Sequence, residues 1–530
     1  MSFDINNFDD PEVWDLICDG NTKGVFQLES NLGKHWAKEI QPRNIKELAA
    51  LVSLIRPGTL LARDANGKSM TQVYADRKAK KPDSPLEYLH DSLEPILKET
   101  FGVLVYQEQS MMIAQQLAGF DLKDVSAPFM GLPLLRCLLG LNSIDEMSVD
   151  EVIIGNTGAP PQYANVARVM ALMAGLDPSV SAYTVHRNCA SGMEAISQGF
   201  LKIQGSRFHL ILAGGVENMS QMPLIYSKEM SELFIRVNKS QGLSEKIKAL
   251  TQFRPPHLSP IIALEQGLTD PFCHLNMGQT AELLAREHNI SREEQDTFAN
   301  RSHSLALKAT EEGVFFDEIV PVLVGQKRDK LLRTDIGPRR NSTVDSLLKL
   351  KPHFEKKSGT VTVGNSCSVT DGGSLCLLAS ADAVKKFKID PMTRVVDFSF
   401  TGLSPERMGM GPLSAIDQIL RRNKLKLDDI DLFEINEAFA AQVLCVLKGL
   451  EDEKIAKAYG LKKAWGRIPY EKLNVNGGGI ALGHPVGSSG SRIVVTLSHE
   501  LKRRKGRYGL ASLCVGGGQG GALLIENLRL

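Results

Sequence analysis

The sequence lacks the features that define several classes of protein. Its 530 residues contain eight scattered cysteines and no pair with zinc-finger spacing, which excludes a disulfide framework and favours a reducing compartment. No apolar run approaches the ~18 residues of a membrane-spanning helix. The acidic N-terminal residues lack the apolar segment of a secretory signal. The formal net charge is +1, so the chain as a whole has no general attraction to nucleic acid or to an anionic membrane. We expect a cytoplasmic protein.

Strands and helices alternate through the chain from residue 122 onward. Apolar segments at 149–156, 182–185 and 209–215 indicate buried strands, whereas 121–141 and 165–174 have helical spacing. Such alternation is typical of a mostly parallel sheet that helices cover on both faces. We therefore predict an α/β fold, in a chain long enough for about three domains.

The first candidate for chemistry is Cys189. It follows the strand at 182–185, in a sharp turn before a helix that opens at Ala190 and Ser191. Unpaired backbone N–H groups and the positive end of the helix dipole favour a thiolate in such a place. The alternative for Cys189 taken alone is a small buried core residue, which is the commonest fate of a free cysteine.

The last third of the chain repeats this arrangement. A helix at 489–501 and a strand at 509–513 follow a glycine-rich turn there, and a second glycine turn closes the strand. The pairs Ser191-Gly192 and Ser489-Gly490 open matching helices. The pattern indicates an internal duplication, which would bring two reactive turns at corresponding strand ends towards one cleft.

Four residues on these turns and strand ends form a chemically coherent set. Cys189 is a candidate nucleophile, His484 a base, Cys514 a second thiol and Asn436 an amide donor. Taken singly, each residue also has an ordinary structural explanation. The Gly-His-Pro at His484 could be a simple turn, Cys514 could be a core residue, and Asn436 could cap the helix that follows. Their occurrence together favours an active site.

These motifs resemble the thiolase family from about residue 122 to residue 530. The residues that carry the resemblance are Asn188-Cys189-Ala190-Ser191-Gly192, Asn436-Glu437-Ala438-Phe439, Gly483-His484-Pro485 and Cys514-Val515-Gly516-Gly517-Gly518. The resemblance implies a duplicated five-layer α-β-α-β-α fold with an inserted loop domain. The N-terminal half would comprise 121–218 and be completed by 367–390, with the loop domain at 219–366 and the C-terminal half at 391–530.

The resemblance also implies a ping-pong acyl transfer. His484 would take the proton of Cys189, which attacks the 3-keto carbon of a 3-ketoacyl-CoA and becomes a thioester, and Cys514 would protonate the departing acetyl-CoA carbanion. One oxyanion site is implied at His484 and a water held by Asn436, and the other at the N–H groups of Cys189 and Gly516.

The family further implies what the protein binds. Met277 and Cys367 would contact coenzyme A, which is a substrate, and no metal or redox cofactor is implied. Thiolases associate through the half that carries the nucleophile, so a homodimer or homotetramer is expected. The segments 219–253, 274–282 and 452–470 look like the thiolase subunit of the fatty-acid β-oxidation complex, which partners a hydratase/dehydrogenase subunit. A departure is Asn436, where that subfamily usually has histidine.

Residues 1–120 resemble a different family, the bacterial DNA polymerase III alpha subunit. The carrying segments are 22–30, 50–58 and 93–109. The resemblance covers only the region after that family's palm, and nothing replaces the aspartates that hold its magnesium ions, so we expect a non-catalytic fragment and no nucleic-acid substrate. The second hypothesis for the whole chain is a catalytically impaired fusion, whose N-terminal piece binds a replication partner or nucleic acid.

The junction near residue 120 departs from the thiolase pattern. Thiolases are expected to begin with a central strand and an Arg-Thr-Pro turn, which do not precede residue 122 here. Loss of a central strand would leave buried backbone groups of two neighbours unpaired. The apolar segment 102–106 is a candidate substitute. In the remainder of the fragment we expect helices at 34–55, 93–99 and 107–117 and a polar loop at 63–85.

Overall fold

The computed structural model describes residues 10–529, except 26–27, 56–58, 61, 65–66, 82–96, 104, 106–124, 143, 146, 255–258 and 325–329. The chain forms two compact units. Unit 1 comprises Met1–Asp121 and Leu323–Leu332, and unit 2 comprises Leu122–Val322 and Arg333–Leu530. No helix among the described residues is long and apolar enough to cross a membrane.

Unit 1 is mainly helical. Its helices are α1 (Pro11–Cys18), α2 (Asn31–Ile40), α3 (Ile45–Leu54), α5 (Met70–Lys78) and a 3-10 turn at Lys98–Thr100. They enclose an apolar cluster that includes Trp14, Trp36, Leu51 and Tyr74. The short strands β6 (Val322–Val324) and β7 (Lys330–Leu332) pair with each other.

Two of the local predictions for unit 1 are wrong. The segment 34–55 is not one helix, because Gln41 takes a left-handed φ of 52° and ends α2, after which Asn44 caps α3. The polar segment 63–85 is not all loop, because the Ser69 hydroxyl accepts a hydrogen bond from the Gln72 N–H and starts α5. The segments predicted at 93–99, 102–106 and 107–117 lie partly or wholly outside the described residues.

The first sheet of unit 2 has four described strands. Their order is β2 (Ser181–Val185), β1 (Glu151–Gly155), β3 (Leu210–Asn218) and β8 (Asp371–Ala379). The first three are parallel and β8 is antiparallel to β3. α8 (Ala127–Leu141) and α9 (Val166–Ala174) cover one face, and α10 (Ser191–Gln204) packs on the other. The strands and helices predicted from alternation are thus confirmed.

The second sheet repeats the first. Its order is β10 (Leu432–Ile435), β11 (Tyr508–Val515), β12 (Gln519–Asn527) and β9 (Thr393–Gly402). β10 and β11 are parallel, and β12 is antiparallel to both β11 and β9. α22 (Val486–Arg504) covers its inner face, while α18 (Gly411–Arg422) lies on the outer face and α19 (Ala440–Glu451) packs beside it.

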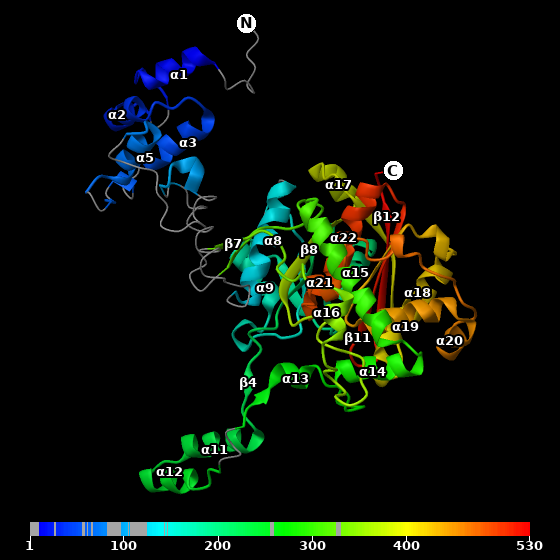
Figure 1. Cartoon of the computed structure of the whole chain (residues 1–530). Helices are drawn as coiled ribbons and strands as arrows, with labels where there is room; N and C mark the ends of the chain where they lie inside the picture. The colour runs from blue at the N-terminus through cyan, green and yellow to red at the C-terminus, as the bar shows by residue number, and fades with distance from the viewer. Residues whose placement is uncertain are drawn as a thin grey trace. The chain divides into compact units, whose positions relative to one another are not determined.

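The two sheets and their helices form the five layers expected of the fold. Figure 1 shows them from left to right, with α8 and α9 followed by the sheet of β8, then α22, then β12, and finally α18. The central layer consists of α10 and α22, which cross where Gly192 faces Gly490. A Cβ on Gly192 would lie 2.8 Å from the Ser491 nitrogen, and one on Gly490 would lie 2.6 Å from the Met193 nitrogen. The glycines let the two matching helices touch along their backbones.

The expectation about a missing central strand is corrected by the second sheet. There the first strand of the half, β9, lies at the sheet edge beside β12. β8 corresponds to β12, since both are the last antiparallel strand of their half, so the corresponding place is the outer side of β8. The four described strands of the first sheet pair without interruption, and no described residue pairs with that outer side. An edge position costs far less to leave open than a central one.

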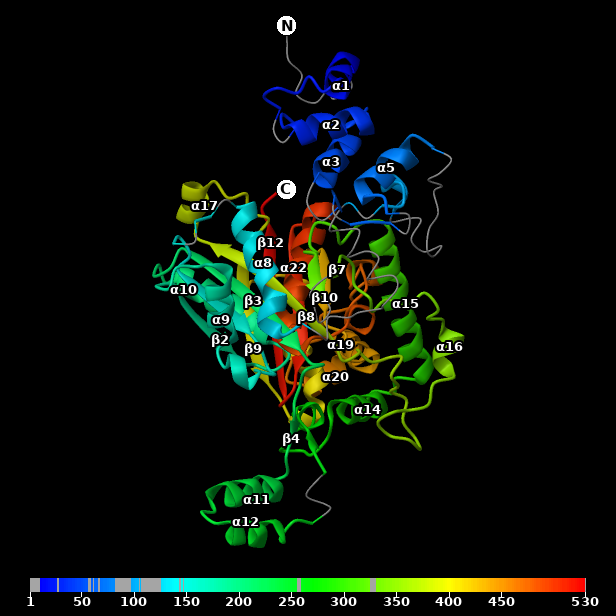
Figure 2. The ribbon, with the colours of Figure 1, turned by 90° about the vertical axis from the view of Figure 1, so that its left-hand side faces the viewer.

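The remaining elements of unit 2 lie mostly in the insertion. They are β4 (Leu224–Ile225), α11 (Lys228–Lys239), α12 (Leu243–Leu250), β5 (Ile261–Ile262), α13 (Ala263–Gly267), α14 (Met277–Glu287), α15 (Arg292–Glu311), α16 (Val344–Leu348), α17 (Ala381–Phe387), α20 (Glu453–Ala458) and α21 (Gly479–Leu482). α14 and α15 pack on α19, which brings this part of the insertion against the second half. In Figure 2, α11 and α12 lie at the end of a thin extension that passes through β4.

Candidate active site

The turn that carries Cys189 is fixed by short hydrogen bonds. Asn188 takes a left-handed φ of 44°, and the Ser191 hydroxyl donates to the Asn188 carbonyl at 2.7 Å and accepts from the Arg187 N–H at 2.8 Å. The Asn188 side-chain amide donates to the Gly516 carbonyl at 2.8 Å. The nucleophile turn of the first half is therefore tied directly to the glycine loop of the second.

The environment of Cys189 keeps its thiol protonated. Burial raises the pKa of Cys189 to about 11, and the backbone N–H groups of Gly516 and of Cys189 itself, which point at the sulfur, only partly oppose this. The N–H groups favour the thiolate in the predicted direction, but desolvation outweighs them in the resting site. A base has to remove the proton before Cys189 can attack.

His484 is suited to be that base. It is 5% exposed, and burial lowers its pKa to about 4, assisted by the positive charge of Arg492, so the imidazole is neutral at physiological pH. Its Nδ1 lies 2.5 Å from the Ser489 hydroxyl, which itself donates to the Pro485 carbonyl at 3.0 Å. Since that hydroxyl has one proton, Nδ1–H donates to Ser489 and the Nε2 lone pair remains available.

Asn436 lies next to the imidazole, immediately after β10. Its Nδ2 is 3.5 Å from His484 Nδ1, and its backbone N–H donates to the Ser512 carbonyl at 2.9 Å. The Asn436 side chain is buried, and its Oδ1 has no hydrogen-bond partner among the described residues. A buried amide oxygen without a partner is costly and marks a place for a polar group of a reactant or water. Asn436 does not cap a helix: α19 starts four residues later and its cap is Phe439.

Cys514 and Gly516 lie at the end of β11 and in the loop after it. Cys514 is 1% exposed, and burial raises its pKa well above the ordinary value, as do the neighbouring thiols Cys189 and Cys367. A Cβ placed on Gly516 would lie 3.4 Å from the Met277 sulfur. Met277, at the start of α14, is therefore beside the same loop whose N–H group points at Cys189.

Cys367 belongs to this group of thiols. Burial raises its pKa to about 12, and a charge on Cys189 would raise it further. Its N–H donates to the Ala438 carbonyl at 3.0 Å. The structure thus brings the three thiols together beside the Gly516 loop, and it separately places Asn436 against His484. No hydrogen bond joins the Cys189 thiol to the His484 ring among the described residues, as is common for catalytic pairs without substrate.

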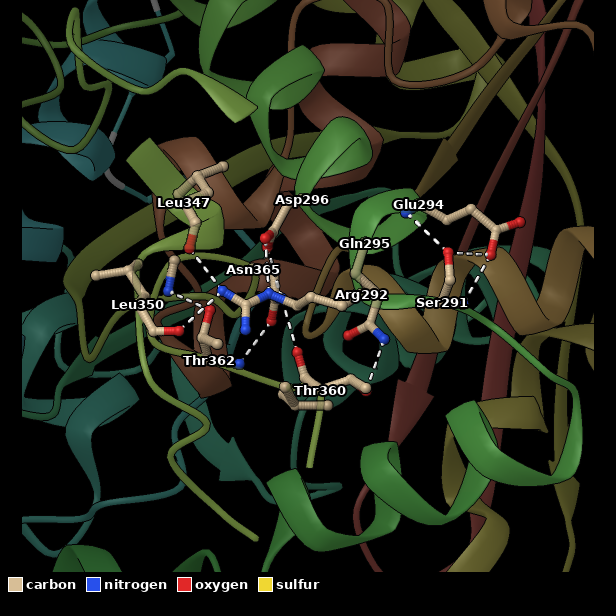
Figure 3. Close-up of polar contacts among 12 residues, drawn as sticks. Ser291, Arg292, Glu294, Gln295, Asp296, Leu347, Leu350, Thr360, Thr362 and Asn365 are labelled. Carbon is tan, nitrogen blue, oxygen red and sulfur yellow. Dashed lines mark hydrogen bonds and ion pairs between the residues drawn. The ribbon is translucent and has the colours of Figure 1, made fainter. Parts of the chain in front are cut away.

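A polar network in the insertion holds the loop before Cys367 (Figure 3). The Asn365 amide donates to Asp296 at 2.9 Å, and Asp296 also receives the Arg292 guanidinium at 2.6 Å. Arg292 donates further to the carbonyls of Leu347 and Leu350. The start of α15 therefore sets the position of the loop that carries Cys367.

Glu217 is a buried residue beside these turns that the sequence did not single out. It is fully buried at the end of β3 and accepts hydrogen bonds from the N–H groups of Thr157, Gly158 and Gly487, each at 2.9 Å. Gly487 lies three residues after His484, so one carboxylate joins the turn after β1 to the turn that carries the base. We assign Glu217 a positioning role.

Part of the evidence for Glu217 is visible in the sequence. Glu217 stands in the run Gly214-Gly215-Val216-Glu217-Asn218, and an acidic residue at the end of an otherwise apolar strand has to find partners. Its partners lie 59 to 61 residues before it and 270 residues after it, which no spacing rule reveals. Ser489 was seen only as a helix opener, although its hydroxyl contacts His484.

Family models match both parts of the chain. The family model of the thiolase N-terminal domain matches residues 109–382, and that of the thiolase C-terminal domain matches residues 389–527. The finger domain of the bacterial DNA polymerase III alpha subunit matches residues 2–127. A probable acetyl-CoA acyltransferase of Staphylococcus aureus (strain N315) is 39% identical over 414 residues, which are 78% of this chain and 96% of that protein.

Solved structures give the same result. A Bacillus anthracis acetyl-CoA acetyltransferase superposes with a TM-score of 0.68 at 39% identity, covering 77% of this chain and 94% of that one. Human mitochondrial 3-ketoacyl-CoA thiolase superposes with a TM-score of 0.66 at 36% identity, again over 77% and 94%, and a further structure of it is in complex with CoA. The chain therefore belongs to the thiolase family of acyltransferases, with a segment similar to a polymerase finger domain at its N-terminal end.

Proposed function

We propose that this protein cleaves 3-ketoacyl-CoA with CoA, through a thioester on Cys189, to give acetyl-CoA and an acyl-CoA shortened by two carbons. The observation that supports this most is a protonated thiol in one half and a neutral imidazole in the other, on turns that hydrogen bonds connect across the duplicated fold. A thiol with a raised pKa needs a base, and the lowered pKa of His484 leaves Nε2 free to accept the proton.

In the first step His484 accepts the Cys189 proton, and the sulfur bonds to C3 of the substrate. The C2–C3 bond then breaks, its electrons pass to C2, and Cys514 donates its proton to C2, so that acetyl-CoA leaves. In the second step the thiol of CoA gives its proton to the Cys514 thiolate and attacks the Cys189 thioester. The shortened acyl-CoA leaves, and Cys189 recovers its proton from His484.

Two sites for developing negative charge fit the groups present. The N–H groups of Cys189 and Gly516, which already point at the sulfur, would bind the oxygen of the acyl group held by Cys189. His484 and Asn436 would bind the thioester oxygen of the leaving acetyl-CoA, directly or through a water. Loss of one such donor typically costs ~3–4 kcal/mol in the transition state.

The substrate range and assembly are finer parts of the proposal. We assign the protein to fatty-acid β-oxidation, as a homodimer or homotetramer that works with a hydratase/dehydrogenase subunit in the cytoplasm. Met277 and Cys367 would contact the pantetheine of CoA, since both lie beside the loop of Gly516 or the thiols. Thiolysis of acetoacetyl-CoA and of long-chain homologues would rank the chain lengths, and a strict preference for acetoacetyl-CoA would contradict the β-oxidation assignment.

The decisive variant is Cys189→Ala. It removes the atom that forms the thioester, so we expect no measurable thiolysis and no acylated protein in mass spectrometry after incubation with acyl-CoA. Cys137→Ala, in α8 on the outer face of the first sheet, is the matched control and should keep both signals. Retention of acyl transfer in Cys189→Ala would sink the scheme.

A second candidate function concerns unit 1. Unit 1 has its own buried cluster, which includes Trp36 and Tyr74, and its similarity to a polymerase finger domain favours a module that binds a replication partner or nucleic acid. Fluorescence anisotropy of labelled single-stranded and duplex DNA with the full chain tests the nucleic-acid part. Unchanged anisotropy at high protein concentration would remove it, and absence of thiolysis in the same preparation would favour an impaired fusion.

A further inference from the structure

Glu437, the residue after Asn436, is fully buried and joins three segments of the chain. Its Oε2 accepts the Ser302 hydroxyl at 2.6 Å and the Ile480 N–H at 3.2 Å, and its Oε1 accepts the Asn474 side-chain amide at 2.8 Å. These partners come from α15 of the insertion, from α21 and from the turn before α21. Burial raises the pKa of the Glu437 carboxyl, and the three donors oppose the rise.

Asn474 extends this link to the strand that leads into Asn436. Its Oδ1 accepts the Ile435 N–H at 2.9 Å, and its Nδ2 donates to the Ile435 carbonyl at 2.9 Å as well as to Glu437. Asn474 takes a left-handed φ of 42°, which asparagine tolerates better than most residues. The peptide group between Ile435 and Asn436 is therefore fixed by the same amide that holds the Glu437 carboxylate.

Two glycines bring the start of α21 against Asn436 and Glu437. A Cβ on Gly478 would lie 2.4 Å from the Glu437 Cδ, and one on Gly479 would lie 3.1 Å from the Asn436 Oδ1. The Gly478 N–H donates to the Ser302 hydroxyl at 3.1 Å, and that hydroxyl gives its one proton to Glu437. The insertion thus contributes one side chain to the packing around Asn436.

His484 is held by other contacts. Its ring meets the Ser489 hydroxyl, and Glu217 holds the turn after it. The Asn436 side chain lacks comparable support, since its Nδ2 reaches the His484 Nδ1 only at 3.5 Å and its Oδ1 has no partner among the described residues. The orientation of Asn436 therefore depends on its backbone and on the packing that Glu437 sets.

We propose that Glu437 and Ser302 are positioning residues for Asn436. The inference rests on the proposed function, in which Asn436 and His484 bind the thioester oxygen of the departing acetyl-CoA. Glu437 touches no reactant in this scheme, and it acts by fixing the peptide before Asn436 and the helix start that faces its amide oxygen. A misplacement of about 1 Å in such a group lowers the rate by about 10²-fold.

Steady-state thiolysis with the best 3-ketoacyl-CoA of the wild type tests the proposal. Glu437→Gln places an N–H donor among groups that all donate, so at least one hydrogen bond is lost and Asn436 shifts. We expect kcat to fall by about 10- to 100-fold, while KM for the 3-ketoacyl-CoA stays within about twofold. Ser302→Ala removes one donor and should lower kcat less, by about threefold to tenfold.

Two further measurements show whether Glu437 acts through Asn436. Asn436→Ala combined with Glu437→Gln should be no slower than Asn436→Ala alone, because residues that act as one unit are not additive. Alkylation of Cys189 by iodoacetamide needs the thiol and its base but no oxyanion site. Its rate and pH profile in Glu437→Gln should therefore equal those of the wild type.

Asp417→Asn is the matched control for a buried carboxylate. Asp417 is 3% exposed in α18 and accepts the Trp465 indole N–H at 3.0 Å on the outer face of the second sheet. This variant should lower the urea midpoint, as Glu437→Gln does, and leave kcat unchanged. Ser304→Ala, at an exposed position of α15, is the control for Ser302→Ala.

Three results would overturn the proposal. They are a kcat of Glu437→Gln within about twofold of that of Asp417→Asn, a change in KM alone, and a loss of Cys189 alkylation in parallel with kcat. Should Glu437→Gln fail to fold, the kcat and alkylation rate of Ser302→Ala decide in the same way. Wild-type protein that thiolyses no 3-ketoacyl-CoA would instead contradict the proposed function itself.

Discussion

The two halves of unit 2 share a frame and differ in their turns. Each half has four described strands, an antiparallel last strand and an inner helix that begins beside a reactive turn. The turn before α10 carries Cys189, with burial raising its pKa, whereas the turn before α22 carries His484, with burial lowering its pKa. The same desolvation thus acts in opposite directions on an acid and on a base.

Under the proposed mechanism, this difference explains why two copies of one unit make one site. In the first half burial keeps the nucleophile protonated and inert, and in the second half burial keeps the base neutral and able to accept a proton. Neither turn has a chemical use alone. The hydrogen bonds Asn188 to Gly516 and Glu217 to Gly487 connect the halves where the two turns meet.

After loss of the nucleophile itself, the largest effect is expected from removing the base. His484→Ala should lower kcat/KM by about 10²–10⁴-fold, because general-base assistance of this size is lost while the thiol pKa stays high. Steady-state thiolysis at neutral pH gives the number. Activity in the variant should recover partly at pH values near 11, where Cys189 ionises without help. A loss that is the same at every pH would mean that His484 acts only as an oxyanion donor.

The pH dependence of the free energy of unfolding tests the lowered pKa of His484 in the second turn. The pKa of His484 is about 4 in the folded chain and 6.5 as its ordinary value, so the unfolded chain binds the extra proton first as pH falls. His484 should therefore cost stability progressively from pH 6.5 down to 4, by up to about 1.4 kcal/mol per pH unit. Urea unfolding of wild type and His484→Asn along this range measures it. Parallel curves for the two proteins would refute the assignment.

Glu217→Gln tests the connection between the halves. The amide nitrogen would face donors such as the Gly487 or Thr157 N–H, and an unmade buried hydrogen bond costs about 1–3 kcal/mol. We expect a lower urea midpoint and a lower kcat with little change in KM, because the base shifts while the CoA site stays. Glu437→Gln, at a buried acid of the second half, should cost similar stability. A change in KM alone would contradict the positioning role.

The smallest effect is expected where the helices cross. Gly192→Ala places a Cβ 2.8 Å from the Ser491 nitrogen, and such overpacking costs about 1–3 kcal/mol. Gly140→Ala in α8 is the matched control, since its Cβ meets nothing within 4 Å, and it should be neutral or slightly stabilising. Equal unfolding midpoints for both variants would show that α10 and α22 can move apart.

The fold of unit 2 was predictable because its signals are local. Buried strands such as β1 and β3 are continuous apolar runs, and the two Ser-Gly pairs at the matching helices revealed the duplication. Cys189, His484, Cys514 and Asn436 were found as a set because each follows a strand or lies in a glycine turn. Their roles remain predictions that the variants above test.

Other features were out of reach for physical reasons. The protonation of Cys189 depends on how much water the assembled halves exclude, which no local pattern reports. The position of the first strand at a sheet edge follows from pairing partners far apart in sequence, β8 with β3 and β12 with β9. In unit 1 the break at Gln41 was missed because apolar spacing continues across it, although the left-handed turn and Pro42 end the helix.

The position of β12 has a consequence for how the protein is made. β12 lies between β9 and β11, pairing with both, yet it is the last strand of the sheet in sequence. On the ribosome, β9, β10 and β11 are synthesised before β12, which lies between β9 and β11. Until β12 is made, the edges of β9 and β11 that face it are unpaired and prone to mispairing. The second half, and with it the base, can close only when residues 519–527 have been synthesised. A chain cut short before residue 519 would therefore lack the strand that joins β9 to β11 and would not complete its second sheet.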